Sequence, residues 1–245
     1  QKSALLRLKN ASADERIEKL KKLQKYMLAH QQDLFDALFQ DFRKPTSEVI
    51  IGELLGVKRE IDHMISHIRS WMKPQSVSTP LLLLGTRGHI QYEPKGLCLI
   101  IAPWNYPYLT AVISIVPALI AGNAVILKHA AQTLLVGERF AKAMEAANLP
   151  KGLFTNLVLT HEDTAKILSS HAVDHCVFTG SVAGGRAIEK AAAGTFTTLG
   201  LELGGKDPAY VRADANFDHA VENLVDGVFF NSGQSCCGIE RIYVH

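Results

Sequence analysis

The sequence places a thiol, a carboxylate and a carboxamide on three separate short motifs. Cys236 lies in the polar, glycine-rich segment Asn231–Gly238, directly after an apolar amphipathic stretch, and Glu202 and Asn105 lie well upstream of it. A thiolate can attack a carbonyl carbon, a carboxamide can stabilise the oxyanion that forms, and a carboxylate can take a proton from water. These residue types together suggest covalent carbonyl chemistry.

Each of the three residues also has an ordinary structural alternative. A lone cysteine near the end of a helix is more often an inert core residue. Glu202 could be a surface carboxylate, although Leu201 and Leu203 on either side favour a partly desolvated position. Asn105 could equally be a turn residue. The three residues by themselves therefore leave the chemistry open.

Four motifs in a fixed order favour the catalytic interpretation. They are Pro103-Trp104-Asn105, Phe178-Thr179-Gly180-Ser181, Glu202-Leu203-Gly204-Gly205-Lys206 and Gly233-Gln234-Ser235-Cys236. The chain thereby resembles the aldehyde dehydrogenase superfamily, in which these motifs follow one another in the same order. The resemblance runs from about the first helices to the last residue. Family members continue well past the cysteine motif, so we expect the chain to correspond to the front part of such an enzyme.

The resemblance implies NAD(P)-dependent oxidation of an aldehyde to a carboxylic acid through a cysteine thiohemiacetal and thioester. Cys236 would attack the carbonyl, and the Asn105 side-chain amide with the Cys236 backbone N–H would hold the oxyanion. After hydride transfer to the nicotinamide, Glu202 would deprotonate the water that hydrolyses the thioester. Glu202 would also help to ionise the thiol.

The cofactor, NAD or NADP, is expected at a glycine-rich turn. Residues 178–185 follow a predicted strand and open a helix, so backbone N–H groups and the Ser181 hydroxyl could hold a phosphate, although such a turn is often purely structural. The resemblance places Ser181 and Gly185 at the pyrophosphate. The cofactor-binding residues that it implies are Ile101, Pro103, Trp104, Lys128, Ala131, Phe178, Gly180, Ser181, Gly185 and Leu203.

One short segment departs from the family pattern. Lys128-His129-Ala130-Ala131 replaces a Lys-Pro-x-Glu whose glutamate binds the adenosine ribose of NAD. Lys128 could be a solvated lysine at the end of a strand, but it can also bind a ribose hydroxyl or a phosphate. Because Ala131 carries no negative charge, we expect NADP to be tolerated or preferred, with Lys128 and His129 close to its 2′-phosphate.

The elements that position these residues follow from hydrophobic periodicity. Ser12 and Glu15 have capping-box spacing and precede an amphipathic helix, a second helix is expected over 33–42, and a third from about 47 to 73. The third helix is expected to bury Ile51, Leu54, Leu55, Ile61, Ile65, Ile68 and Trp71. Residues 81–84, four leucines, and 89–93 are expected to be extended pieces around a glycine turn.

From residue 97 onward, apolar strands alternate with helices. Strands are expected at 97–102, 124–128, 155–159, 175–179 and 197–203, and helices at 113–121, 134–147, 163–170 and after Ser181. This alternation predicts an α/β fold with a doubly wound parallel sheet, whose ligands bind at the carboxyl ends of the strands, where Trp104, Lys128, Gly180 and Glu202 fall. A last amphipathic helix, with Phe217, Ala220, Val221, Leu224 and Val228 on one side, leads to the Cys236 turn.

We expect four segments along the chain. The resemblance implies N-terminal helices over 1–75, an extended oligomerisation segment over 76–94, a dinucleotide-binding domain of the aldehyde dehydrogenase-type Rossmann variant over 95–204, and the start of a second α/β catalytic domain over 205–245. Four adjacent exposed leucines would be an aggregation hazard, so the second segment is expected to pack on another subunit of a homo-oligomer, a dimer or tetramer, or on another part of the chain.

Composition excludes several classes of partner. The 245 residues carry 26 basic and 24 acidic side chains, and no basic block is interleaved with aromatics, so nucleic acid is not an expected partner. The longest apolar run, 112–127, is interrupted and too short to span a membrane. Four cysteines and ten histidines show neither disulfide nor metal-ligand spacing, which favours a reducing, cytoplasmic location, no metal, and core positions for Cys98 and Cys176. Cys237 receives no role.

The substrate and two alternative functions are left open. The resemblance implies an aldehyde tunnel lined by Tyr106, Leu109, Thr110, Ile113 and Phe229 or Phe230. These residues are mostly apolar and include no arginine, which favours medium-chain aliphatic or aromatic aldehydes over semialdehydes. One alternative is a coenzyme A-acylating member of the superfamily, against which Glu202 argues. The other is a non-catalytic cofactor-binding or assembly fragment, because the family's later glutamate at the nicotinamide ribose is not in the chain.

Overall fold

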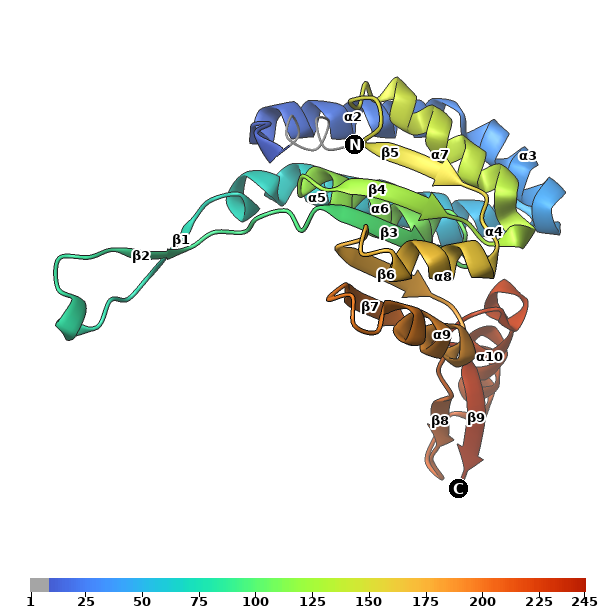
Figure 1. The fold of residues 1–245 in the computed structure, drawn as a ribbon. Coiled ribbons are helices and arrows are strands. Elements are labelled where there is room, and N and C mark those ends of the chain that lie inside the picture. Colours follow the sequence, from blue (N-terminus) through green and yellow to red (C-terminus); the bar gives the residue numbers. More distant parts are fainter. Residues whose placement is uncertain (1–8) are drawn as a thin grey trace.

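The structure is a computed structural model that describes residues 9–245, so the first eight residues of the expected N-terminal segment lie outside the described residues. Figure 1 shows a layer of helices over a central sheet, a long arm that projects from one end, and a small C-terminal unit beyond the last strand of the sheet. Among the described residues, no helix is both long and apolar enough to span a bilayer.

The first two predicted helices are confirmed. Helix α2 (Ala13–Ala29) begins with the predicted capping box, in which the Ser12 hydroxyl accepts the Glu15 N–H and the Glu15 carboxylate accepts the Ser12 N–H. Helix α3 (Gln31–Phe42) follows at once. The buried face of α2 consists of the apolar residues that the periodicity indicated, Ile17, Leu20, Leu23 and Met27.

The third helical region is confirmed, but its buried face was predicted wrongly. It consists of α4 (Thr46–Val49), the π-helical turn η1 (Ile50–Leu54) and α5 (Leu55–Trp71). Ile51, Leu55 and Trp71 are 62%, 44% and 45% exposed, whereas a carboxylate, Glu53, is fully buried. A π turn contains more residues than an α-helical turn, so side chains near it do not follow the regular helical spacing.

The predicted parallel sheet is confirmed. Its strands are β3 (Leu97–Ile101), β4 (Ala124–Lys128), β5 (Phe154–Leu157), β6 (His175–Thr179) and β7 (Thr198–Glu202). They lie side by side in the order β5-β4-β3-β6-β7, and every neighbouring pair is parallel. The chain therefore winds outward from β3 through β4 and β5 and then returns to β6 on the other side of β3, which creates a topological switch point between β3 and β6.

Four helices connect these strands and cover both faces of the sheet. They are α6 (Leu109–Ile120), α7 (Leu134–Ala146), α8 (His161–Ser169) and α9 (Val182–Ala192). A large apolar core joins the sheet to α2, α5, α6 and α7, and a smaller one joins it to α8 and α9. Cys98 lies in the first core and Cys176 in the second, so both predicted core thiols are confirmed.

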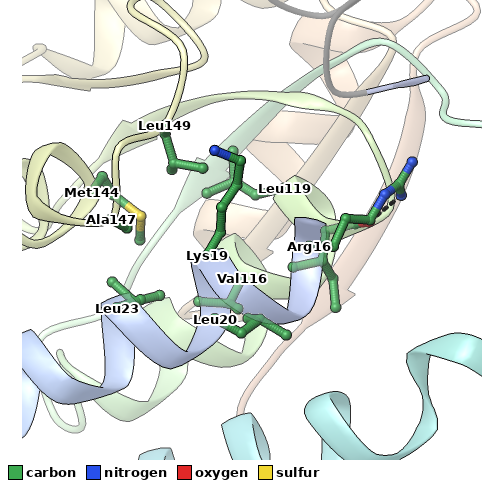
Figure 2. A pocket seen from close by; sticks show the side chains of 10 residues that line it. Arg16, Lys19, Leu20, Leu23, Val116, Leu119, Met144, Ala147 and Leu149 are labelled. Carbon is green, nitrogen blue, oxygen red and sulfur yellow. Dashed lines mark hydrogen bonds between the residues drawn. The ribbon is translucent and has the colours of Figure 1, made fainter. Parts of the chain in front are cut away.

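A small apolar pocket lies where α2, α6 and α7 meet. Leu20, Leu23, Val116 and Leu119 line it, with Lys19 among the labelled side chains around it (Figure 2). Because its walls are aliphatic side chains of the helical core, we interpret it as a packing gap.

The arm consists of a two-stranded antiparallel ribbon, β1 (Gln75–Val77) and β2 (Gly88–Ile90). The extended conformation expected over 81–84 is wrong, because Leu81–Leu83 form a 3-10 turn, η2, directly after Pro80. The expectation for 89–93 is correct only for its first two residues. The leucines at 81–84 are 84%, 97%, 54% and 85% exposed, so the tip of the arm is an uncovered apolar surface.

The C-terminal unit contains helix α10 (Phe217–Phe229) and a parallel pair of strands, β8 (Asp207–Val211) and β9 (Ile239–Val244). The helix is confirmed, whereas the strand pair was not predicted. A 3-10 turn, η4 (Phe230–Gly233), follows α10 and leads into the cysteine motif. No residue of α10 is buried.

Candidate active site

The carboxyl ends of four adjacent strands bring the predicted motifs to one edge of the sheet. Ile101 at the end of β3 pairs with Lys128 of β4 and with Phe178 of β6, and Thr179 of β6 pairs with Glu202 of β7. These strand ends and the segments that follow them carry the three sequence motifs upstream of the cysteine motif. The predicted placement of these motifs at one sheet edge is therefore confirmed.

The Asn105 carboxamide lies directly beside residues 231–238, the turn that carries Cys236 and is called the cysteine turn below. Its Nδ2 donates to the carbonyl of Gln234 over 2.9 Å, two residues before Cys236. Asn231 contacts the same group, since its Nδ2 lies 3.2 Å from the Asn105 carbonyl and 3.1 Å from the Gln234 carbonyl. A carboxamide nitrogen carries two hydrogens, so Asn105 retains one donor beyond the bond to Gln234.

An unusual backbone conformation shapes the turn that carries Cys236. Asn231, Ser232 and Gly233 have φ values of 53°, 57° and 73°, in the left-handed region. Two of these residues are not glycine, and each costs roughly 1–2 kcal/mol in this conformation. The hydrogen bonds of the buried Asn231 side chain offset part of that cost. Sequence analysis predicted a turn here but missed the role of Asn231.

The Cys236 thiol is exposed, and its pKa is raised above the ordinary range. Partial burial is the main cause, the neighbouring Cys237 adds to it, and the negative charge of Glu202 adds a smaller contribution. Glu202 is therefore close enough to act on the thiol. Its negative charge disfavours the thiolate, so Glu202 could help ionisation only by taking the thiol proton itself, and that expectation stays a prediction.

Glu202 itself lies in a different environment from the one that the sequence suggested. Its side chain is exposed rather than partly desolvated, because β7 is an edge strand of the sheet and its carboxyl end has a solvent side. The loop after β7 passes close to the cysteine turn, and a methyl group added at Gly205 would lie 2.8 Å from the Cys236 carbonyl oxygen. The carboxylate and the thiol thus belong to adjoining loops.

The turn after β6 forms an open N-terminus on α9. Ser181 is the N-cap residue, and its hydroxyl oxygen accepts the Gly184 N–H over 3.1 Å. A Cβ atom added at Gly180 or Gly184 would lie 2.7 or 2.5 Å from the Phe178 ring. The two glycines therefore allow the ring of Phe178 to pack against the turn, and the hydroxyl hydrogen of Ser181 is still available to a ligand.

The other expected cofactor residues surround this turn. Gly185 is buried against Leu203, whose side chain lies 2.8 Å from the place of a Cβ on that glycine. Ile101 is buried in the smaller core, and Trp104 is partly exposed with its ring edge-on to Phe42. The glycines let Phe178 and Leu203 pack directly against the backbone of the turn, and the first N–H groups of α9, which have no partner within the helix, fit a dinucleotide phosphate.

Lys128 and His129 lie at the end of β4, and both are buried. Burial lowers the pKa of Lys128. It also lowers the pKa of His129 to about 4, so this imidazole is neutral. Its Nε2 donates to the Pro107 carbonyl over 3.0 Å, and its Nδ1 accepts from Thr133 and from the Ala130 N–H. The His129 ring therefore has no free nitrogen with which to bind a 2′-phosphate, because both ring nitrogens are bonded inside the protein. Ala131 is exposed.

The residues expected to line an aldehyde tunnel do not all face the cysteine. The Leu109 side chain packs against Gly56 of α5 and thus belongs to the helical core. Ile113, Phe229 and Phe230 are 45%, 67% and 43% exposed. The Tyr106 ring lies against Gly52 on one side, and its hydroxyl contacts Ser235 of the cysteine turn on the other.

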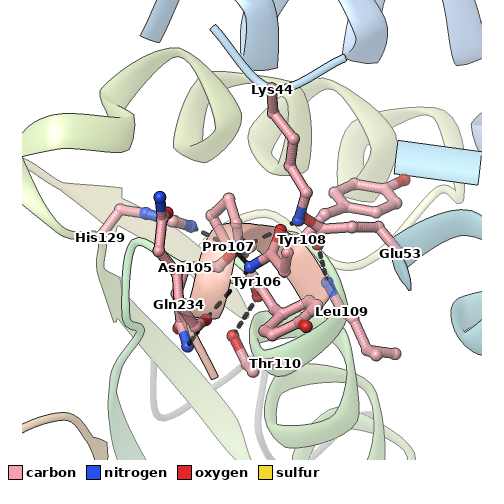
Figure 3. A network of polar contacts seen from close by, with 11 residues as sticks. Lys44, Glu53, Asn105, Tyr106, Pro107, Tyr108, Leu109, Thr110, His129 and Gln234 are labelled. Atoms are coloured by element: carbon pink, nitrogen blue, oxygen red, sulfur yellow. Dashed lines mark hydrogen bonds and ion pairs between the residues drawn. The ribbon is translucent and has the colours of Figure 1, made fainter. Parts of the chain in front are cut away.

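Two charged residues that were not predicted contact the Asn105 loop, residues 105–109, from the helical core. Lys44 and Glu53 form a buried ion pair, with 2.8 Å between Nζ and Oε1, and both bind the backbone of residues 105–109 (Figure 3). Burial raises the pKa of Glu53, against the opposing effect of Lys44. The available signal was the four-residue spacing of Val49, Glu53 and Val57, which puts the carboxylate on an apolar face.

Comparisons with known proteins agree with this arrangement. The model of the aldehyde dehydrogenase family matches residues 1–245. The chain is 32% identical over its whole length to a putative aldehyde dehydrogenase, AldX, of Bacillus subtilis, of which it covers 54%. It is 36% identical to mouse aldehyde dehydrogenase family 3 member B3, over 96% of this chain and 48% of that protein.

A solved structure shares the fold as well. The crystal structure of an E. coli NADP-dependent enzyme matches with a TM-score of 0.91 at 29% identity, over 99% of this chain and 50% of that chain. The chain thus spans about half the length of the relatives that it matches.

Proposed function

The chain belongs to the aldehyde dehydrogenase family, and from this premise we propose that the protein oxidises an aldehyde to a carboxylic acid with NAD or NADP. The observation that carries the proposal is the contact between the Asn105 carboxamide and the Gln234 carbonyl, which sets a free N–H donor beside the Cys236 turn. Glu202 acts electrostatically on the same thiol, so nucleophile, oxyanion donor and base come from three adjoining loops.

Cys236 is the proposed nucleophile. Its raised pKa means that little thiolate exists at neutral pH, so the thiol must lose its proton to a base as it attacks. Glu202 is the nearby group that can take this proton and become neutral, which removes the charge that opposes the thiolate. Attack forms a C–S bond, and the carbonyl π electrons move to oxygen.

The oxyanion of the resulting thiohemiacetal requires donors that are aimed at it. We assign this role to the remaining Asn105 Nδ2 hydrogen and to the Cys236 backbone N–H. A nicotinamide dinucleotide bound at α9 would supply the acceptor for the hydride that leaves this carbon, and Cys236 would then carry a thioester. Glu202, which is exposed, releases the thiol proton to solvent and then acts as general base by taking a proton from the water that attacks the thioester, and the Cys236 thiolate leaves as the carboxylic acid forms.

The cofactor would be held at the open N-terminus of α9. Ser181 and the first backbone N–H groups of α9 would bind the pyrophosphate, with Phe178 and Gly185 shaping the floor beneath it. Lys128 would bind the ribose or a 2′-phosphate at the end of β4. Since Ala131 is exposed and uncharged, nothing at that position repels a phosphate, and we propose that NADP is accepted.

The substrate and assembly complete the proposal. The residues expected to line the substrate tunnel include Tyr106, Phe229 and Phe230 and no arginine, which favours aliphatic or aromatic aldehydes over those with a distal carboxylate. The exposed leucines at 81–84 favour a homo-oligomer in which the arm packs on another subunit. All four cysteines are free thiols, which fits a reducing location such as the cytoplasm.

The test is turnover with a simple aromatic or aliphatic aldehyde, measured from the absorbance of the reduced nicotinamide with NAD and with NADP. Cys236→Ala is expected to abolish turnover and to leave cofactor binding intact, while Cys237→Ala, the matched neighbouring control, remains active. Cofactor binding without any turnover in the parent protein would contradict the catalytic proposal and favour a cofactor-binding role alone.

A further inference from the structure

Two charged side chains lie in the helical core, outside the four sequence motifs. The side chains of Lys44 and Glu53 are 1% and 0% exposed, and Nζ lies 2.8 Å from Oε1. Attraction between two buried charges recovers the free energy lost on removing them from water only when both groups make further hydrogen bonds. The other partners of the two groups therefore indicate what the pair does.

The second partner of Lys44 is the Asn105 loop. Its Nζ donates to the Asn105 carbonyl oxygen over 3.2 Å, and the ammonium lies 4.4 Å from the centroid of the Tyr106 ring. These contacts use the ammonium both as a donor and as a cation over an aromatic face. Lys44 therefore fixes the backbone at the residue whose side chain would hold the oxyanion.

The remaining partners of Glu53 lie in the same loop. Its Oε2 accepts the N–H groups of Tyr108 and Leu109, each over 2.9 Å. These are the first N–H groups of α6, which have no partner within a helix, and α6 has no side-chain cap from its own N-cap residue. A carboxylate is also favoured by the dipole at this end of a helix. Glu53 thus caps α6 from another helix.

The loop is bound from the opposite side by the cysteine turn. The Asn105 carbonyl accepts from Asn231 Nδ2 as well as from Lys44, at 3.2 Å in both cases, and the Asn105 side chain binds Gln234. Figure 3 shows this series of contacts, from Glu53 through Lys44 and the loop to Gln234. A displacement of the loop on the Glu53 side would therefore move the Asn105 carboxamide relative to Cys236.

We propose that Lys44 and Glu53 are positioning residues. They hold the Asn105 loop, and with it the oxyanion donor, in a fixed position relative to the Cys236 turn. The inference rests on the proposed function, in which Asn105 stabilises the oxyanion. Neither residue contacts the reacting atoms in this proposal, since both act through the backbone of residues 105–109.

Replacing both residues by apolar ones distinguishes an ion pair that only stabilises the fold from one that also positions the Asn105 loop. Replacing both members of a buried ion pair by apolar side chains of similar size is often neutral or stabilising. The double variant Lys44→Met/Glu53→Leu is therefore expected to fold, with a melting temperature moderately below the parent's because two N–H groups at the start of α6 lose their acceptor, while kcat falls by about ten- to a hundredfold because the loop is no longer anchored. KM and the Kd of NAD(P) are expected to change less than about twofold, because the cofactor turn on α9 is untouched.

Two further variants separate positioning from general destabilisation. In Glu53→Gln, the carboxamide oxygen can still accept both N–H groups, so kcat is expected to stay within about threefold of the parent value. Leu168→Ala, a cavity in the smaller core on α8, is expected to lower the melting temperature and to leave kcat unchanged. Parental kcat in the double variant would overturn the proposal.

Hydrogen exchange of the backbone supplies a readout that does not depend on turnover. The amides of Tyr108 and Leu109 are expected to exchange slowly in the parent and in Glu53→Gln, and rapidly in the double variant. If the double variant does not fold, the parent alone tests the proposal. Exchange of its Tyr108 and Leu109 amides is then compared with exchange of Val182 and Ala183 in the first turn of α9. Equal exchange at the two helix starts would refute the anchoring. Slow exchange in a parent that oxidises no aldehyde would instead refute the proposed function alone.

Discussion

Asn105 donates from its side-chain nitrogen to the backbone carbonyl of Gln234 over 2.9 Å, which joins the loop after β3 to the turn that carries Cys236. These segments are more than a hundred residues apart in the sequence. The bond fixes the orientation of the carboxamide, so its second N–H has a defined direction before any substrate binds. Such preorganised donors cost no reorganisation when charge develops on the oxygen.

Removal of this carboxamide is the first prediction. Asn105→Ala is expected to lower kcat by about a hundred- to a thousandfold, because one oxyanion donor is lost and the turn loses a contact. The Kd of NAD(P), measured by fluorescence titration, is expected to stay close to the parent value. Asn223→Ala, on the exposed surface of α10, is the matched control. An equal loss of kcat in both variants would contradict a specific role for Asn105.

The ionisation of Cys236 gives a prediction about pH. Its thiol pKa is raised, in part by the charge of Glu202, so alkylation by iodoacetamide is expected to increase up to pH values above the ordinary range of a cysteine. Glu202→Gln removes a negative neighbour and therefore lowers the thiol pKa, so alkylation at about pH 8 becomes faster. Peptide mapping in a Cys237→Ala background assigns the labelled sulfur.

Turnover responds to the same substitution in the opposite direction. Glu202→Gln removes the proposed general base and is expected to lower kcat at every pH, even while the thiol becomes more reactive toward iodoacetamide. Unchanged or slower alkylation in this variant would show that the Glu202 charge does not act on Cys236.

Regular periodicity predicted the sheet well and the irregular parts poorly. The strands at 124–128 and 175–179 were predicted with their observed bounds, because five apolar residues between turn signals leave few alternatives. Strand β8 was missed, since Pro208 within a short segment argues against a paired strand. The buried face of residues 47–73 was partly wrong, because a π turn interrupts the helical spacing near Glu53.

The candidate site residues divide into those within sequence motifs, which were predicted, and those outside them, which were not. The motifs identified the candidate residues Asn105, Glu202 and Cys236, whereas Lys44 and Glu53 belong to no motif, and only the place of Glu53 on an apolar face indicated its burial before its contacts were known. His129 was assigned to the cofactor from its charge and neighbours in sequence. Its burial and its bond to Pro107 depend on tertiary packing, which local sequence does not encode.

The packing of Phe178 on the turn before α9 predicts that one substitution weakens cofactor binding and that a second substitution partly restores it. In Gly184→Ala the new methyl group would lie 2.5 Å from the Phe178 ring, so the ring or the turn expected to bind the cofactor must shift. The Kd of NAD(P) is expected to rise at least about tenfold. Adding Phe178→Leu relieves the clash and is expected to restore part of the affinity. Gly200→Ala, where a methyl group meets only ordinary contacts, is the control.

The arm predicts an effect on assembly. Leu82 and Leu84 are among the most exposed apolar side chains of the described residues, and charges there would prevent burial against another subunit. Leu82→Glu/Leu84→Glu is expected to convert the oligomer into a monomer by light scattering coupled to size exclusion. Val158→Glu, exposed elsewhere, is expected to leave the mass unchanged. A parent protein that is already monomeric would contradict the proposed assembly.

The preference between NAD and NADP can be tested by introducing a negative charge at an exposed position. Ala131 begins a 3-10 turn after β4, and its side chain is exposed, so a glutamate can be introduced there without disturbing the core. The new carboxylate would accept from the adenosine ribose hydroxyls of NAD and repel the 2′-phosphate of NADP. Ala131→Glu is therefore expected to lower the Kd of NAD and to raise the Kd of NADP. The ratio of the two Kd values is expected to change at least about tenfold in favour of NAD.

The neutral variant Ala131→Gln separates charge from size in this experiment. It offers similar bulk and a hydrogen-bond acceptor but does not repel phosphate, so its Kd ratio is expected to lie between those of the parent and Ala131→Glu. Raised ionic strength should reduce the discrimination against NADP by Ala131→Glu, because the repulsion is electrostatic and screened. A ratio that does not respond to the added charge would place the 2′-phosphate away from position 131, and the missing carboxylate at Ala131 would then not explain why NADP is accepted.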